Sequence, residues 1–223
     1  MDLLVSSFFN ADILAQTWPF LLSGFWMTIK LTLVVVPIGA AGGLAVALLS
    51  TVRSRLLRWT LVVYVDFFRA FPPLVLLMFI AFGLPFLKID LGAFGSVAVA
   101  FLLNTSSYYG EIFRAGIESI PRGQYEAARS TGLSAVQTMT YVVIPQATKN
   151  VTPDLVSNTL EVVKLTSIAS VVALPELLFA ARQAQSVTYN ATPIIAAGII
   201  YLVCLWPLVR LLSRFEHRQI ALH

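Results

Sequence analysis

The sequence predicts an all-α membrane protein, a polytopic helix bundle of about five transmembrane helices. Hydrophobic residues make up 58% of the 223 positions and charged residues 12%, which is about half the charged fraction of an ordinary soluble domain. A water-soluble fold of this size could not bury so much apolar surface. Five apolar stretches are each long enough to cross a bilayer, and basic residues cluster on one side of them. We therefore expect residues 1–223 to form a single membrane domain.

The predicted spans follow from the length that a bilayer requires. A transmembrane helix needs about 20 mainly apolar residues, and the stretches that provide them are 18–50, 59–86, 95–113, 151–174 and 193–212. The first has no basic region ahead of it and is too long for a cleaved signal peptide, so we expect it to be retained. Gly39, Ala40, Gly42 and Gly43 give it a face of small residues, which suits close helix packing. Pro72 and Pro73 are expected to separate a surface segment, 57–71, from the second crossing helix.

Basic residues predict the orientation of the chain. Those that follow spans one, three and five are Arg53, Arg55, Arg58, Arg114, Arg122, Arg129, Lys149, Arg210, Arg214 and Arg218, whereas the opposite connections hold only Lys88 and Arg182. Because basic residues favour the cytoplasmic side, the N-terminus is predicted to lie outside and the C-terminus in the cytoplasm. An odd number of spans requires the same arrangement.

The connection between spans three and four, 114–150, is too long for a turn and too polar for the membrane. Pro121 stands just before a stretch that favours helix, where proline suits a helix start. Gly132 is placed like a glycine that ends a helix in the left-handed conformation. Ser134 could cap a second helix, and Pro145 marks where that helix bends or stops. This pattern predicts a helix, a glycine turn and a second helix that project on the cytoplasmic face.

The sequence lacks the motifs of enzymes and metal sites. It has no Gly-x-x-x-x-Gly-Lys-Ser/Thr phosphate loop, so this chain is not expected to bind ATP by itself. His217 and His223 lie far along the chain from any cluster of carboxylates or thiols, and Cys204 is the single cysteine, which argues against a metal site or a disulfide framework. The net charge of +4 is modest, and its placement beside the spans indicates membrane orientation rather than a nucleic-acid partner.

Ionisable and polar residues inside the predicted spans are the candidates for a substrate path. Such residues are costly in lipid and tend to face a bundle interior or a water path. Glu161 and Lys164 are three residues apart on one helical face and could pair, as could Glu111 and Arg114. The polar residues near these pairs are Asn104, Thr166 and Ser167. Two interpretations stay open: the pairs lock helices together, or they line a path through spans three and four.

The cytoplasmic connection carries a resemblance to a known family. The residues Gly123-Gln124-Tyr125-Glu126-Ala127-Ala128, then Gly132, then Val142-Val143-Ile144-Pro145 resemble the EAA loop in the permease subunits of bacterial ABC importers. The segments 109–120, 68–74, 83–85 and 164–168 are similar to the polar amino acid branch of that family, with the type I importer fold and a permease core at about 19–213. Two positions depart from the branch: Leu165 stands where Asp is usual, and Gly110 stands where a small Ala-like residue is usual.

The resemblance implies a mechanism and a set of partners. Two permease subunits, the same or paralogous, would form the pathway above two ATPase subunits that bind ATP and magnesium, and a periplasmic binding protein would deliver the substrate. The EAA loop would be the coupling helix, with Glu126 and Arg129 in charge-assisted contact with the ATPase and with Ala127 and Ala128 permitting close approach. The coupling residues implied are Gly123, Gln124, Glu126, Ala127, Ala128, Arg129, Gly132 and Pro145.

This resemblance leads to an expected function in the bacterial inner membrane. The substrate would be a polar amino acid or a related compound such as an opine, imported by alternating access, with no cofactor bound by this chain. Two alternatives remain, an importer of another small solute and a self-contained secondary transporter or channel. The last gives no reason for the pattern that runs from Glu126 to Pro145.

Overall fold

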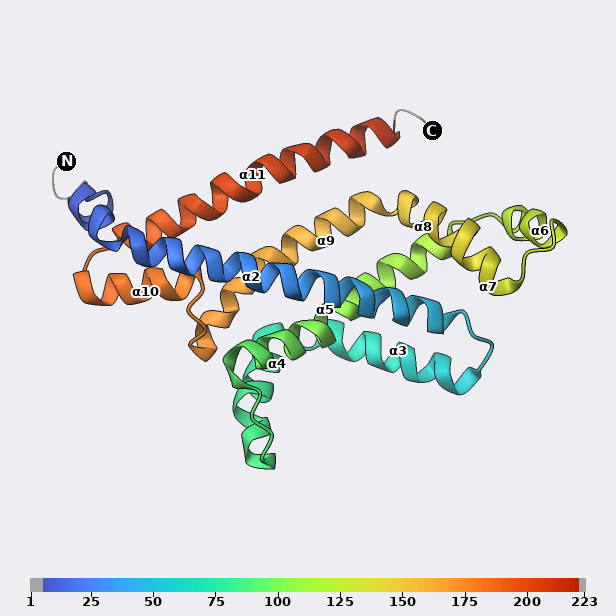
Figure 1. The fold of residues 1–223 in the computed structure, drawn as a ribbon, viewed down its shortest axis with the longest axis horizontal. Coiled ribbons are helices and arrows are strands. Elements are labelled where there is room, and N and C mark those ends of the chain that lie inside the picture. The colour runs from blue at the N-terminus through green and yellow to red at the C-terminus, as the bar shows by residue number, and fades with distance from the viewer. Residues whose placement is uncertain (1–5, 221–223) are drawn as a thin grey trace.

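A computed structural model describes residues 6–220 of the protein and the side chains of residues 6–210. The predicted basic positions Arg214 and Arg218 and the two histidines lie outside the described side chains. Within residues 6–220 every regular element is helical (Figure 1). The elements are α2 (Ala11–Ser50), α3 (Arg55–Ala70), α4 (Pro73–Met78), η1 (Phe79–Gly83), η2 (Leu84–Leu87), α5 (Gly92–Glu118), α6 (Arg122–Ser130), α7 (Ala135–Gln137), η3 (Thr138–Val143), α8 (Ile144–Asn150), α9 (Thr152–Leu165), η4 (Thr166–Val172), α10 (Leu177–Thr188) and α11 (Thr192–Ile220).

Helix α2 runs along most of the bundle (Figure 1). It begins where the Asn10 side chain accepts hydrogen bonds from the backbone N–H groups of Asp12 and Ile13, which satisfies two of the four free donors at a helix start. The helix continues through Pro19 and Pro37 for 40 residues, a length of about 60 Å. It therefore exceeds the thickness of a bilayer core, which is about 30 Å, and starts seven positions before the predicted span.

The small-residue face of α2 packs against α5, which confirms the predicted close contact. A Cβ atom on Gly43 would lie 2.4 Å from the Tyr109 Cβ and 2.7 Å from the Gly110 backbone nitrogen. A Cβ atom on Gly39 would lie 2.0 Å from the Thr105 Oγ1. Gly110 is itself tight, since its Cβ would lie 3.0 Å from a methyl group of Val46. Glycine at 110 therefore lets the two backbones approach more closely than alanine would.

The break at Pro72 and Pro73 is confirmed. Helix α3 ends at Ala70, Phe71 and Pro72 are extended, and the following helical segment turns away by 101°. Proline cannot donate the backbone hydrogen bond that would continue α3, and it pushes the residue before it into an extended conformation. The segment after the break, Pro73–Leu87, passes from α-helix into a π turn and a 3₁₀ turn, and it projects from the side of the bundle (Figure 1).

The described helices support a membrane bundle, while the count of five spans stays a prediction. By length and composition, three helices could cross a membrane, Ser6–Ser50, Thr152–Val172 and Thr192–Arg210, and the bent pair α3 and α4–η2 could provide a fourth. Helix α5 is 27 residues long, but its polar run Asn104–Tyr108 interrupts the apolar sequence. Because those residues are largely buried against other helices, α5 can keep them without exposing them to lipid. The predicted orientation likewise remains a prediction.

Candidate functional site

The predicted helix, glycine turn and helix are present between α5 and α8, at the end of the bundle opposite the N-terminus (Figure 1). Pro121 is extended just before α6, and Gly132 follows α6 with a φ of +88°, which is the left-handed conformation that glycine adopts without strain. Ser134 caps the next helix: its Oγ accepts from the Gln137 N–H, and the Gln137 side chain accepts from the Ser134 N–H. The signals at Pro121, Gly132 and Ser134 therefore have their expected structure.

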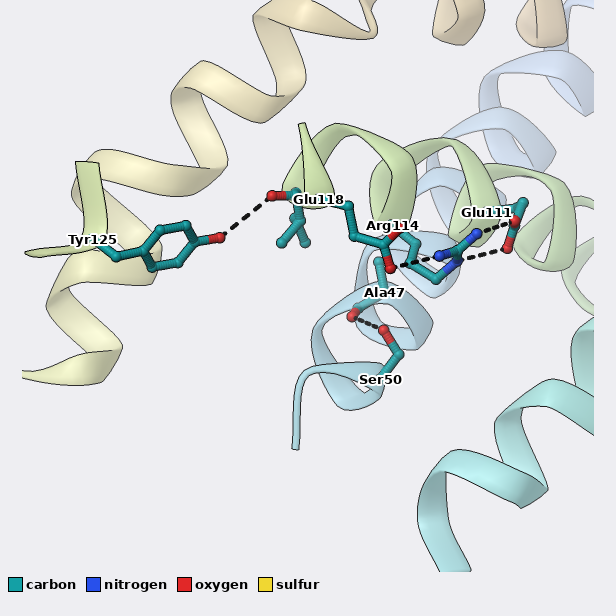
Figure 2. A network of polar contacts seen from close by, with 7 residues as sticks. Ala47, Ser50, Glu111, Arg114, Glu118 and Tyr125 are labelled. Carbon is teal, nitrogen blue, oxygen red and sulfur yellow. Dashed lines mark hydrogen bonds and ion pairs between the residues drawn. The ribbon is translucent and has the colours of Figure 1, made fainter. Parts of the chain in front are cut away.

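Two side-chain hydrogen bonds join α6 to α5 and to α8. The Tyr125 hydroxyl donates to the Ile117 carbonyl near the end of α5 at 3.3 Å (Figure 2). The Gln146 amide on α8 donates to the Gln124 Oε1 at 3.3 Å. Burial raises the pKa of the Tyr125 hydroxyl, so this group keeps its proton and remains a donor. A force on α6 would consequently act on α5 and α8 together.

Most of the predicted coupling residues face outward. The exposed ones are Gly123, Gln124, Glu126, Ala127, Arg129, Gly132 and Pro145. Ala128 is only 7% exposed and packs inward, so a partner surface can reach Ala127 more readily than Ala128. Pro145 does not end its helix: the π turn Thr138–Val143 leads into α8, and Pro145 lies in the first turn of α8, where a missing N–H is tolerated.

The predicted pair of Glu111 and Arg114 is formed, and a third residue joins it (Figure 2). The Arg114 Nε donates to Glu111 Oε2 at 3.0 Å, and its Nη1 donates to Glu118 Oε1 at 2.6 Å. These residues line a cavity of about 550 Å³ between α2, α3 and α5, into which Arg58 and Asp66 of α3 also extend. The cavity thus presents both signs of charge and could hold a polar or zwitterionic molecule.

The polar residues of α5 fasten it to its neighbours. Asn104 is 3% exposed, and its amide donates to the Phe68 carbonyl at 2.9 Å, close to the break after α3. The hydroxyls of Tyr109 and Thr159 share a hydrogen bond of 2.7 Å that joins α5 to α9. Because Thr159 donates its own proton to the Leu155 carbonyl, Tyr109 is the donor to Thr159.

The substrate-path candidates of span four divide into surface and interior residues. Glu161 and Lys164 form the predicted ion pair, with side chains that are 67% and 50% exposed respectively. Thr166 is fully buried and donates to the Val163 carbonyl, while Ser167 donates to the Lys164 carbonyl. The described part of the chain therefore does not gather all six candidates into one site: Asn104 and Thr166 are interior, and Glu111 lines the cavity described above.

One buried carboxylate was missed by sequence reasoning. Glu176 has no exposed surface, and its carboxylate accepts hydrogen bonds from the N–H groups of Leu178 and Phe179 at the start of α10. The Tyr201 hydroxyl on α11 also donates to it, at 3.2 Å. A single Glu after a proline in an otherwise apolar segment was the available signal. This residue joins α10 to α11 beside α2, whose Gly24 lies against the Glu176 carbonyl.

Comparisons with known proteins agree with this arrangement. Residues 39–220 match the family described as binding-protein-dependent transport system inner membrane component. The chain is 36% identical over 187 residues to the arginine transport system permease protein ArtQ of Bacillus subtilis, covering 83% of this chain and 85% of the relative. It is 35% identical over 209 residues to the L-cystine transport system permease protein TcyB of the same organism, covering 92% and 88%.

Solved structures give the same result. A crystal structure of an amino acid ABC transporter with histidines superposes with a TM-score of 0.82 at 37% identity, covering 92% of this chain and 96% of that one. An inward-facing methionine ABC transporter superposes with a TM-score of 0.74 at 21% identity, which supports the fold alone. The fold is thus that of an ABC importer permease. The chain belongs to the family of binding-protein-dependent transport system inner membrane components.

Proposed function

We propose that this chain is the transmembrane permease subunit of an ATP-driven, binding-protein-dependent importer that carries a polar amino acid or a related compound into the cytoplasm. The observation that carries the proposal is the exposed α6 with its Gly132 turn and the capped helix that follows. This unit is anchored to α5 and α8 by the bonds of Tyr125 and Gln124. A movement of a partner bound to α6 would therefore be transmitted to α5 and α8.

The substrate class rests on the relatives. Arginine and cystine transport permeases are both more than 30% identical to this chain over most of its length. In this chain Leu165 is half-buried and packs against the main apolar core, at the position where the resemblance expects Asp. Without a carboxylate at this position the chain would select a cationic ligand less strongly, because a buried carboxylate binds a cation in preference to a neutral or anionic group. An opine-like or neutral polar substrate is consistent with this change.

The partners follow from the same proposal. A second permease chain, identical or paralogous, would complete the pathway in the bacterial inner membrane, and a periplasmic binding protein would deliver the solute. Two ATPase subunits would bind ATP and magnesium, so that this chain binds no cofactor itself. Gly123, Gln124, Glu126, Ala127, Arg129 and Gly132 would form the surface that the ATPase contacts, with Ala128 supporting it from inside and Pro145 at its border.

The test is whether an ATPase binds through α6. Glu126→Lys reverses a charge on the exposed face of α6, and we expect it to reduce the amount of ATPase subunit that copurifies with the tagged chain by about tenfold, since it replaces an attraction with a repulsion. Asp154→Lys is the matched control, an exposed acid in the first turn of α9, and should leave copurification near wild type. Absence of any ATPase with the wild-type chain would sink the proposal.

A transport assay separates the remaining alternatives. Proteoliposomes that contain the purified complex with α6 and its ATPase facing the lumen should take up a labelled amino acid only when ATP is inside the vesicles and the binding protein is outside. Uptake without ATP or without the binding protein would instead indicate a secondary transporter. A solute of another class that competes fully, while no amino acid does, would keep the importer and reject the substrate class.

A further inference from the structure

The coupling unit consists of α6, the Gly132 turn and α7, residues 122–137. A second cavity lies between the end of α2 and this unit, on the side of α6 that faces the bundle. Its volume is about 690 Å³. Leu48, Thr51 and Arg53 line it from the end of the first span, and Tyr125 and Arg129 line it from α6. The remaining wall comes from Ile117 on α5 and from the segment Ala135 to Ile144. In the part of the chain that the structure describes, no hydrogen bond crosses this cavity from Thr51 or Arg53 to the coupling unit.

The charges on the cavity wall are of one sign. Arg53 and Arg129 are its charged lining residues, and no acidic side chain lines it. Arg129 uses its Nη1 to donate to the Leu133 carbonyl, which leaves its other nitrogens available. Arg53 makes no hydrogen bond or ion pair among the described residues. Because guanidinium groups bind phosphate oxygens with charge-assisted hydrogen bonds, the two arginines suit a phosphate group.

A hydroxyl group inside the same cavity lacks a partner. Thr138 lines the cavity and is only 3% exposed, and its Oγ1 has no hydrogen-bond partner among the described residues. A buried hydroxyl without a partner costs free energy. The Thr138 oxygen is buried, and rotation of the side chain about χ1 would let it hydrogen-bond to a molecule that enters the cavity. The rest of the wall is apolar, including Leu48, Met139 and Ile144, which favours a molecule with a hydrocarbon part as well as a polar group.

The position of the cavity at the predicted cytoplasmic end of the first span favours a membrane lipid as the source of such a molecule. Ser50 is the last residue of α2, and Arg53, Arg55 and Arg58 follow it at the end of the first span that the basic residues predict to be cytoplasmic. Basic pockets at the cytoplasmic ends of helices are the places where anionic lipid headgroups bind. We propose that this cavity binds an anionic phospholipid of the cytoplasmic leaflet, with its phosphate between Arg53 and Arg129 and an acyl chain against Leu48 and Met139.

A bound lipid would connect the end of α2 to α6, between which no hydrogen bond or ion pair is formed within the described residues. The phosphate would bridge the end of α2 to α6, so that movement of the coupling helix would be shared with the longest helix of the bundle. Coupling between ATP hydrolysis and transport would then depend on the anionic lipid content of the membrane. This inference rests on the proposed function and shares Arg129 with the proposed ATPase contact, whereas Arg53, Thr138 and Met139 line the cavity without belonging to that contact.

The test measures lipid retention by the complex as purified from membranes. Phosphatidylglycerol that remains bound after exchange into detergent is counted by native mass spectrometry, with phosphatidylcholine as the competing neutral lipid. Arg53→Ala should reduce the retained phosphatidylglycerol by about fivefold, the effect expected of one basic residue near a lipid surface. Arg55→Ala is the matched control, because it removes the same charge two positions away and lines neither cavity.

A second variant probes the hydroxyl. Thr138→Val keeps the shape and removes the donor. If a headgroup uses this hydroxyl, Thr138→Val lowers phosphatidylglycerol retention, whereas if the hydroxyl is merely unsatisfied the variant is neutral or more stable and retention is unchanged. This second outcome, or equal retention by wild type and Arg53→Ala, would overturn the proposal.

Two other occupants are distinguished in the same experiment. Inorganic phosphate that displaces the retained lipid at millimolar concentration would show a site for a free anion rather than for a lipid. If Arg53→Ala instead lowers the amount of copurified ATPase while phosphatidylglycerol retention stays at the wild-type level, the cavity belongs to the ATPase contact and the lipid assignment is wrong.

Discussion

Gly43 faces the backbone of α5, and replacing it with alanine is the most direct test of how the bundle packs. The added Cβ would lie 2.4 Å from the Tyr109 Cβ and 2.8 Å from the Tyr109 carbonyl carbon. These atoms belong to the α5 backbone or are fixed to it, so no flexible side chain can move aside. The helices must separate by about 1 Å to restore an ordinary contact distance.

The cost of this separation can be estimated. Overpacking by one methyl group in a tight interface costs about 1–3 kcal/mol, and the upper half of that range applies because the clash is with the backbone. For a chain of this length, 1 kcal/mol corresponds to a change in melting temperature of about 2–4 °C. We therefore expect Gly43→Ala to lower the melting temperature by about 4–12 °C.

The assay is thermal denaturation of the purified complex, followed by fluorescence-detected size exclusion. Gly198→Ala is the matched control, since Gly198 also lies in a membrane helix but its Cβ would meet no atom of this chain within 4 Å. That variant should be neutral or slightly more stable, because alanine loses less backbone entropy than glycine in a helix. A melting temperature of Gly43→Ala within 2 °C of both wild type and Gly198→Ala would refute this account of the α2–α5 contact.

Two further predictions concern the coupling unit and the α5–α9 contact. Gly132 and Gly123 both have open space around a Cβ, but of the two only Gly132 has a positive φ. Gly132→Ala should therefore destabilise the turn by about 1–2 kcal/mol and speed amide hydrogen exchange in residues 122–137. Gly123→Ala should do neither. Equal exchange in the two variants would contradict this. Tyr109→Phe removes the donor to Thr159 and should lower the free energy of unfolding by about 1 kcal/mol. Adding Thr159→Val should then cause no further loss. Additive losses in melting temperature would argue against the hydrogen bond.

Local features of the coupling unit could be predicted because each depends on a few neighbouring residues. Pro121 suits the position before a helix, Gly132 adopts its positive φ without strain, and Ser134 caps α7 together with Gln137 three positions later. The ion pairs of Glu111 with Arg114 and of Glu161 with Lys164 were predictable for the same reason, since helical geometry alone brings residues three apart together.

Other features could not be read from the sequence. The apolar pattern does not reveal that α5 keeps its polar run by facing α2 and α3, because burial depends on which helices surround it. Likewise, Ala127 and Ala128 look equivalent in the motif, and only the packing of α6 decides that Ala128 turns inward. Glu176 caps the start of α10 through the N–H groups of Leu178 and Phe179, which is a local contact, whereas its bond from Tyr201 on α11 exists only because the two helices pack together.

The sequence by itself determined that this chain is a membrane protein with a projecting helix–glycine–helix unit, because apolar length, proline, glycine and capping residues act over a few positions. Only the tertiary structure decided which glycines touch which backbone, where the buried carboxylate is satisfied, and that a cavity with two arginines lies behind α6. These features join residues far apart in the chain, such as Gly24 and Glu176. Their contact energies exist only once the helices have packed, and no local pattern in the sequence encodes them.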